Sequence, residues 1–545
     1  MEIRKKIRES AFAHCLDSVF ASKWFVVGII LLGIVANFFA LEMWMYRISF
    51  VVAMLVVVFA RDFKPLVPLC CIFYMVTSVG NNPLYAPASS ETPSIYLDKN
   101  CLIELVVLGS ILVVNMLVRI GLDTGYRGFF SLRQGEMKLS LLLVALGLLL
   151  GGIGYSYNPE LAEKANAYWW NAITEQGYTF RTLFFGGANA ACMAGFYLCF
   201  RPMIDWSRCG KEYIFFVLTM LASFVAIQVL YQYCTLQNVF YYTVDGKTYY
   251  CGIGEAFAHL GDNLGIDRGK FQYGWGVYNN IGGMLAFMFP AAFYLACRGK
   301  YGFFYNMLGN LLYVFTVLSM SRSAILMGTI VYIASVVVVC VKAEYRWRNR
   351  IVFLALFTTL AVLFLLFQDF WLDLFAILYR GKEDGFFNDS GRFEIWKVGM
   401  LLFGDNPIFG SGFYALRPIF ANGITGRFHN TIIQYMASCG IVGTAFYLYH
   451  RFVTVRKILT KPNLEKVMLG VCMAGLLLTG LLDCHMFNFG PLIVYSFVMV
   501  FLERPQESEK KEPTPDAEAT ENADNAENAD NADNAETAQL PTETE

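Results

Sequence analysis

The sequence predicts an all-α polytopic membrane protein with about 12 to 14 transmembrane helices. Of its 545 residues, 57% are hydrophobic and only 16% are charged, and the mean hydropathy is +0.48. Apolar runs of about 20 residues, the length that crosses a bilayer, recur along the chain. Soluble domains averaging about 100 to 200 residues each do not have this composition.

The individual spans follow from the apolar runs, and those with aromatic residues at their ends are accepted when somewhat shorter. Their number varies by about two with the way closely spaced runs are divided. The candidate spans lie near residues 24–41, 44–60, 66–80, 101–119, 139–155, 182–200, 213–234, 276–297, 302–319, 324–341, 351–367, 430–449, 466–482 and 487–502.

Basic residues mark alternate loops between these spans. The start, MEIRKKIRES, is basic and no small-residue cleavage site follows the first apolar run, so it is interpreted as the cytoplasmic leader of the first helix. Every second loop after it carries lysines and arginines, whereas the others, including residues 235–275 and 368–429, mix both signs with aromatic residues. The positive-inside rule therefore predicts a multi-pass protein of the plasma or inner membrane, with both termini in the cytoplasm and the long loops outside.

The exterior loop near 239–251 predicts a β-hairpin. Its sequence, VFYYTVDGKTYYC, places Asp245 and Gly246 between two aromatic, β-prone runs. Cys234 and Cys251 flank this loop and could form a disulfide in an oxidising exterior. Most of the other cysteines lie inside apolar runs and are interpreted as small buried hydrophobic residues.

The exterior loop 368–429 predicts a helix. It is expected to begin at a capping residue, Asp389 or Ser390, and to end between residues 404 and 407. Phe393, Trp396 and Met400 would share one face, so the helix is expected to lie in the outer membrane interface.

Several classes of protein are disfavoured. The basic residues sit in short loops and not on one face, so no nucleic-acid partner is expected. The chain has no HExxH, Walker, GxSxG or DxD motif, which disfavours a metalloprotease, a nucleotide hydrolase and a metal-dependent nucleotide-sugar transferase. No metal ion and no cofactor is predicted. Residues 503–545 are acidic and nearly free of large apolar side chains, which predicts a disordered cytoplasmic tail.

Two arginines and one histidine on the predicted outer side are the candidate site. Arg322 sits in a short exterior turn, against the usual charge bias, and Arg392 stands near the positive end of a helix dipole, where it could hold an anion. The alternatives are an arginine that reaches the lipid headgroups and a plain solvated charge. His429 stands at the start of a helix beside Arg427 and Asn430, where a purely structural role is the alternative.

His485, two residues after Asp483, is a rival candidate for the base. Guanidinium groups bind phosphate oxygens, and a neutral imidazole accepts a proton near pH 7. Together they suit transfer from a lipid diphosphate to a hydroxyl, with the arginines in place of a metal ion and the histidine as base.

Three motifs in order carry a resemblance to a known family. They are LSMSRSAILMG, then GRFEIWKVGMLLFGDNPIFGSGFYAL, then FHNTIIQYMASCGIVGTAFYLY. Together they resemble the O-antigen ligase and polymerase superfamily of bacterial membrane glycosyltransferases, over residues 276–450. The resemblance divides the chain into N-terminal transmembrane helices (1–275), a catalytic region (276–450), C-terminal transmembrane helices (451–502) and the tail.

The resemblance implies a GT-C-like helical fold and transfer of a glycan from undecaprenyl diphosphate to an acceptor hydroxyl, with inversion and without metal. Arg322 and Arg392 would then bind the donor diphosphate and His429 would be catalytic, with Arg427, Asn430, Trp396 and His485 as possible support. The acceptor would be a lipid, glycan or protein, and membrane lipids would surround the chain. A polymerase of lipid-linked repeat units stays open beside the ligase, since about fourteen helices exceed the dozen typical of ligases. A lipid or sugar transporter is the alternative from another class.

Overall fold

Helices form nearly all of the regular structure in the computed structural model. It describes residues 10–76, 99–126, 135–155, 185–259, 264–368 and 391–505, with gaps at 40, 271, 274, 300, 367, 414–416, 419–423 and 426. Residues 1–502 form one compact unit. The prediction of a disordered tail falls almost wholly outside the described residues.

Each candidate span overlaps helical backbone. The helices in chain order are α3 (Lys23–Phe38), α4 (Glu42–Phe59), α5 (Leu66–Phe73), α6 (Lys99–Thr124), α8 (Glu136–Leu150), α12 (Gly187–Ala190) continuing into α13 (Phe196–Phe200), α14 (Tyr213–Thr235), α16 (Tyr278–Met288) followed by α17 (Pro290–Ala296), α18 (Gly302–Leu318), α19 (Arg322–Lys342), α20 (Arg346–Leu366), α23 (Thr431–Leu459), α24 (Leu464–Gly480) and α25 (Phe489–Leu502). The predicted all-α architecture is therefore confirmed.

Six of the helices in the described part of the chain are long and apolar enough to cross a membrane. A seventh span results if α2 (Ala11–Ala21) and α3, which meet at 71°, are counted as one. The other candidate spans are helices of fewer than 18 residues or helices with a break, such as the one between α16 and α17 at Pro290. The chain is an integral membrane protein.

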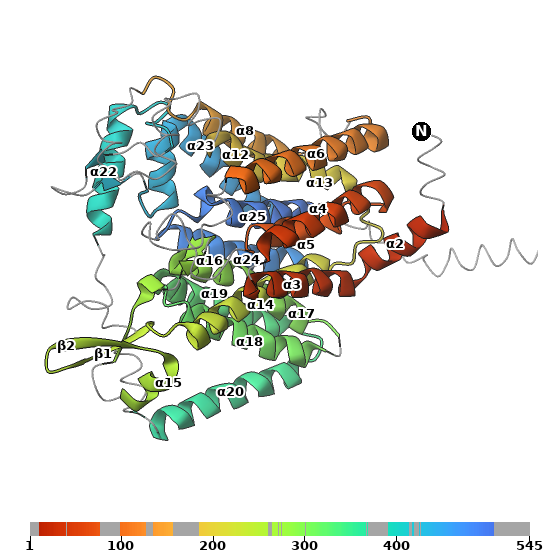
Figure 1. The fold of residues 1–545 in the computed structure, drawn as a ribbon. Helices are drawn as coiled ribbons and strands as arrows, with labels where there is room; N and C mark the ends of the chain where they lie inside the picture. The colour runs from red at the N-terminus through yellow and green to blue at the C-terminus, as the bar shows by residue number, and fades with distance from the viewer. Residues whose placement is uncertain are drawn as a thin grey trace, which may run out of the picture. The chain divides into compact units, whose positions relative to one another are not determined.

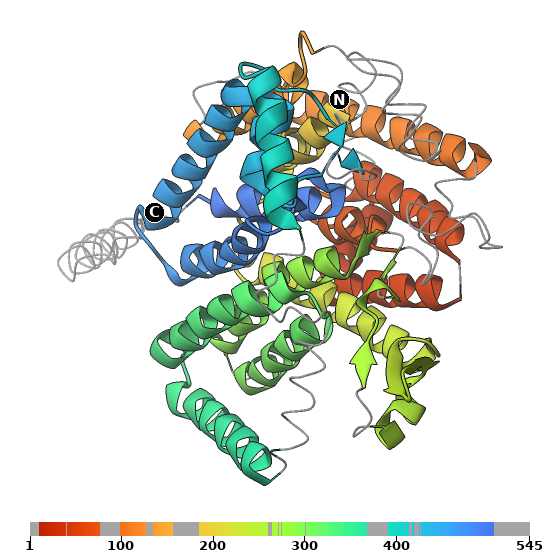
Figure 2. The same cartoon turned by 90° about the vertical axis from the view of Figure 1, so that its left-hand side faces the viewer.

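The starts of four helices meet at one end of the bundle. The side chain of Ser321 before α19 bonds to Asn279 at the start of α16. Asn280 of α16 bonds to Asn488 before α25, and Asn430 before α23 bonds to Leu481 after α24. In Figure 1 the hairpin of β1 (Phe240–Val244) and β2 (Lys247–Cys251) and the helix α22 (Arg392–Asp405) lie on the left. Figure 2 looks onto that side, with α22 in cyan in front of α23.

Helix α23 is interrupted at Gly440, whose φ of 62° and ψ of −163° are not helical. Residues 407–412, from the NPxxGxG motif, lie against the break and satisfy the backbone groups that it leaves without helical partners. The N–H groups of Ser411 and Gly412 donate to the carbonyl oxygens of Ala437 (2.7 Å) and Ser438 (3.0 Å). The N–H groups of Ile441 and Val442 donate to the carbonyl oxygens of Pro407 (2.8 Å) and Ile408 (3.2 Å). The motif thus replaces one turn of the helix.

Replacing Gly440 with alanine is expected to destabilise the protein. This backbone conformation is nearly exclusive to glycine, and a Cβ there would overlap the carbonyl oxygen of Ile408. The expected loss of about 1 to 3 kcal/mol should lower the midpoint of thermal unfolding in detergent. Gly404→Ala in α22 is the matched control, because a Cβ there meets nothing within 4 Å. Equal midpoints for the two variants would contradict this role of Gly440.

The predicted hairpin is confirmed. Strands β1 (Phe240–Val244) and β2 (Lys247–Cys251) pair antiparallel, and β3 (Gly265–Ile266) pairs with β1. Asp245 and Gly246 have φ values of 51° and 74°, the conformation that a type I′ turn needs. Cys234 and Cys251 are both free thiols, so the disulfide considered above is not formed.

The helix predicted in the large exterior loop is α22 (Arg392–Asp405), and its end agrees with the prediction. Its N-cap is Gly391 in a left-handed conformation, whereas Asp389 and Ser390 fall outside the described residues. Phe393 and Met400 are exposed, at 61% and 42%, and the opposite face packs against α23. The exposed apolar face suits the membrane interface, and that placement stays a prediction.

Candidate functional site

The start of α23 is fixed by a network around Asn430. The Asn430 side-chain oxygen accepts hydrogen bonds from the N–H groups of Ile432 (2.9 Å) and Ile433 (3.1 Å), and its amide donates to the carbonyl of Leu481 (2.9 Å). The hydroxyl of Thr431 donates to the carbonyl of Asp483 (3.1 Å). Asn430 is therefore the N-cap of α23 and also joins this helix to the segment that follows α24.

His429 directly precedes this cap and lies beside a carboxylate. Its Nδ1 is 3.3 Å from Oδ1 of Asp483, and its side chain is 38% exposed while that of Asp483 is 10% exposed. A ring proton on Nδ1 would face the carboxylate and leave Nε2 free to accept a proton. His429 also has a φ of 46°, which costs about 1 to 3 kcal/mol for a residue other than glycine. The surrounding contacts therefore hold the backbone of His429 in a strained conformation, while its imidazole stays accessible.

Asp483 is an anion in this setting. Burial alone would raise the pKa of its carboxyl group, but the interactions with His429 and His485 and the N–H of Cys484 outweigh burial and lower the pKa. The Cys484 N–H lies 2.7 Å from Oδ1. A negative charge next to Nδ1 orients an imidazole and stabilises the imidazolium that forms when it takes up a proton.

His485 lies on the other side of Asp483 and is completely buried. Burial lowers the pKa of His485, and neither of its ring nitrogens has a hydrogen-bond partner. The ring packs against Gly283 of α16, where a Cβ would overlap it. Its burial argues against proton transfer from a substrate hydroxyl, which leaves His429 as the accessible histidine.

Arg322 is the half-buried first residue of α19. The preceding Ser321 caps the helix and donates a hydrogen bond to the side-chain oxygen of Asn279 in α16 (2.9 Å). Gly283, one turn farther along α16, packs against His485. The start of α19 and the ring of His485 thus contact adjacent turns of α16.

Arg392 begins α22, which packs on the first turns of α23. Gly399 of α22 lies against Phe428, the neighbour of His429, where a Cβ would be 3.0 Å from the Phe428 ring. Gly399 follows Arg392 by seven residues, about 10 Å along the helix axis. Trp396, one turn after Arg392, has a buried ring N–H without an acceptor. The structure therefore places the helix of Arg392 directly against the segment of His429.

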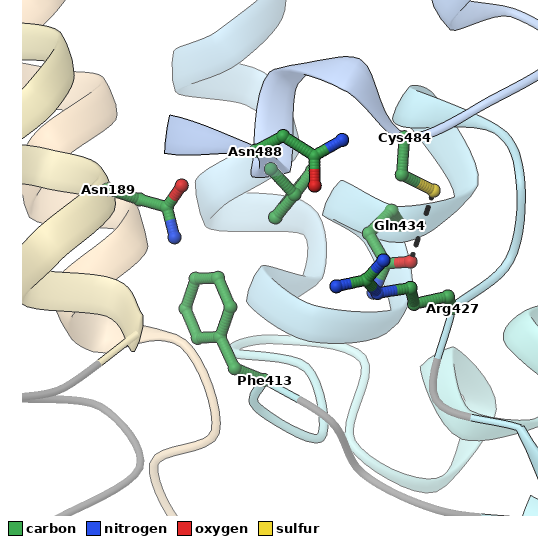
Figure 3. A pocket seen from close by; sticks show the side chains of 7 residues that line it. Asn189, Phe413, Arg427, Gln434, Cys484 and Asn488 are labelled. Carbon is green, nitrogen blue, oxygen red and sulfur yellow. Dashed lines mark hydrogen bonds between the residues drawn. The ribbon is translucent and has the colours of Figure 1, made fainter. Parts of the chain in front are cut away.

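Arg427 points into a small pocket beside the pair of His429 and Asp483 (Figure 3). The pocket also includes Gln434, whose side-chain oxygen accepts from the N–H of Phe428 (3.0 Å) and lies 3.4 Å from the Cys484 sulfur. Burial and the neighbouring Asp483 raise the pKa of the Cys484 thiol to about 12, so it is not a nucleophile at neutral pH.

Residues 308–448 match a family model described as O-antigen ligase. This region of the chain belongs to the O-antigen ligase superfamily. The resemblance of the sequence motifs is thereby confirmed, and the matched residues lie inside the region 276–450. The ligase region contains Arg322, Arg392 and His429, whereas Asp483 and His485 lie beyond it. No curated protein matches the chain.

The sequence predicts Asp483 only as a neighbour of His485, and its contact with His429 was not predicted. A signal was present in LLDCHMFNFG, where one carboxylate interrupts a long apolar run. An ionisable group in such a run is costly without a partner, so it predicts a charge pair. The identity of the partner needed the fold.

Proposed function

We propose that the protein is an extracytoplasmic glycosyltransferase that moves a glycan from an undecaprenyl-diphosphate carrier to an acceptor hydroxyl, with inversion and without a metal ion. The observation that carries this proposal is the accessible His429 whose Nδ1 faces buried Asp483 at the end of the bundle. The ligase family of residues 308–448 supports the reaction class. The site would face outward from the plasma or inner membrane, with both termini in the cytoplasm.

The chemistry is a single displacement. Nε2 of His429 removes the proton of the acceptor hydroxyl, whose oxygen attacks the anomeric carbon from the side opposite the diphosphate. The new glycosidic bond forms as the bond to the diphosphate oxygen breaks and polyprenyl diphosphate leaves. Asp483 stabilises the imidazolium, which then returns its proton to solvent. Arg322 and Arg392 offset the charge that develops on the diphosphate.

Arg322→Ala and Arg392→Ala are each expected to lower transfer by about 100-fold or more, since each removes a charge that stabilises the leaving group. In cells the surface glycan should disappear and the lipid-linked glycan should accumulate, with normal membrane insertion. Lys397→Ala is a matched control, because Lys397 is an exposed cation on α22 that pairs with Glu394. Normal surface glycan in both arginine variants would overturn their proposed role.

A polymerase that extends the lipid-linked glycan is the second candidate, because the same displacement serves both reactions. The acceptor hydroxyl then belongs to another lipid-linked glycan and not to a final lipid or protein acceptor. The glycan that accumulates in the inactive variants separates the two. Long chains indicate a lost ligase, and single repeat units indicate a lost polymerase.

A further inference from the structure

Gln434 is a buried amide beside the two segments that carry His429 and Asp483. It lies on the first turn of α23 and is 4% exposed. Its side-chain oxygen accepts hydrogen bonds from the N–H of Phe428 (3.0 Å) and from the thiol of Cys484 (3.4 Å), the second of which is drawn in Figure 3. Phe428 directly precedes His429. Cys484 directly follows Asp483, so one oxygen atom joins the two segments of the pair.

The other end of this amide is fixed as well. The side-chain nitrogen of Gln434 donates to the hydroxyl of Ser438 (3.0 Å), a residue that is 1% exposed. The carbonyl of Ser438 accepts from the N–H of Gly412 at the break of α23. If the amide turned over, its nitrogen would face the N–H of Phe428, which is also a donor. The orientation of Gln434 is therefore set by a residue at the break of the helix.

His429 needs this support because its backbone is strained. Its φ of 46° is unfavourable for a residue other than glycine. Asn430 fixes the chain after His429 through its bonds to the first turn of α23, and Gln434 fixes the chain before it. The ring of Phe428 is also buried, in a small apolar cluster between α22 and α23. Loss of the amide should therefore shift the imidazole without unfolding the segment.

We propose that Gln434 is a positioning residue for His429. Its oxygen holds Phe428 and Cys484, and the N–H of Cys484 in turn donates to Oδ1 of Asp483 (2.7 Å). The separation of 3.3 Å between Nδ1 of His429 and Oδ1 of Asp483 depends on this arrangement. A displacement of about 1 Å at such a site can lower the rate about 100-fold. This inference rests on the proposed glycosyl transfer and adds to it a residue that acts only through His429.

Two substitutions separate the hydrogen bonds of Gln434 from its volume. Gln434→Met keeps the length of the side chain and removes both the acceptor and the donor. Its kcat for transfer should fall about 10- to 100-fold, while the KM values for donor and acceptor stay within about 3-fold of the wild type. Gln434→Glu should recover most of this loss. A protonated carboxyl group accepts from Phe428 and donates to Ser438, and an ionised one accepts from both.

Hydrogen exchange measures the same contact without any need for transfer. In the full-length protein in detergent micelles, the amide of Phe428 should exchange about 3- to 10-fold faster in Gln434→Met than in the wild type, the effect of one hydrogen bond. Gln434→Glu should keep the protection of the wild type, because its carboxyl oxygen still accepts from this amide.

Gln228→Met is the matched control. Gln228 is a fully buried glutamine of α14 whose nitrogen donates to Asn37 (2.7 Å) and whose oxygen accepts from Trp275 (3.3 Å). Its substitution also removes a buried amide that is bonded at both ends, but in a network that includes neither His429 nor Asp483. The kcat of this variant should equal that of the wild type.

Each result decides the inference. An undiminished kcat in Gln434→Met, or an equal loss of kcat in Gln434→Glu or in Gln228→Met, would overturn the positioning role. Unchanged exchange of the Phe428 amide in Gln434→Met would do the same. Absence of transfer by the wild type would overturn the proposed function and this role with it, whereas the other contrary results strike the positioning role alone.

Discussion

His429→Ala is expected to abolish the surface glycan while the protein still inserts into the membrane. General base catalysis is worth roughly 100- to 10,000-fold in rate, and no other histidine of the described site is accessible. The lipid-linked glycan should accumulate to the same extent as in the arginine variants. Immunoblots of membranes for the protein and gel analysis of the glycan measure both parts of this result.

His259→Ala provides the control for this prediction. His259 lies near the hairpin, in the other long segment that is predicted to be exterior, and stacks on Tyr242 with ring centroids 3.7 Å apart. Its replacement removes a histidine from the same predicted side of the membrane without touching Asp483, so glycan assembly should continue. Wild-type glycan levels in the His429 variant would show that the imidazole is a structural element of the helix start.

Asp483→Asn is expected to reduce transfer about 100- to 10,000-fold with little change of shape. The bond from Thr431 goes to the backbone carbonyl of Asp483 and survives the substitution. What is lost is the charge that orients His429 and stabilises its protonated form. A combined His429→Ala and Asp483→Asn variant should be no worse than His429→Ala alone, because the two residues act as a unit.

Stability measurements also test the role of the Asp483 carboxylate. The pKa of Asp483 is lowered in the folded protein, so its ionised form stabilises the fold. That contribution is fully present above the carboxyl's unfolded pKa of about 3.9 and is lost as pH falls through the lowered folded value. The difference in unfolding midpoint between the wild type and Asp483→Asn should therefore be constant near neutrality and shrink in strong acid.

The elements that sequence reasoning predicted are those with a local cause. The lengths of the apolar runs predicted the helices, and the turn at Asp245 and Gly246 predicted the hairpin. Both signals are local, because the spacing of apolar residues and the conformation of a turn depend on a few neighbouring residues. The break of α23 at Gly440 was not predicted, although its glycines were visible. The break depends on hydrogen bonds to residues 407–412, a separate segment of the chain.

The candidate site was likewise predictable from the sequence only in part. The roles suggested for Arg322, Arg392 and His429 came from their positions at helix starts and from the family motifs. The structure places the start of α19, where Arg322 stands, beside α16, and it places the helix of Arg392 against Phe428. The roles of these residues stay proposals. The role of Asp483 could not be assigned from sequence, since its partner His429 belongs to a distant segment that only the fold brings close.

Transfer by the purified protein in proteoliposomes tests the central claim most directly. Wild-type protein supplied with a lipid-diphosphate glycan and its acceptor, in the presence of EDTA, should form one glycosidic bond for each polyprenyl diphosphate released. The His429→Ala protein, equally folded and equally incorporated, should release almost none. Movement of the lipid-linked glycan across the bilayer without bond formation, or equal transfer by both proteins, would contradict the account.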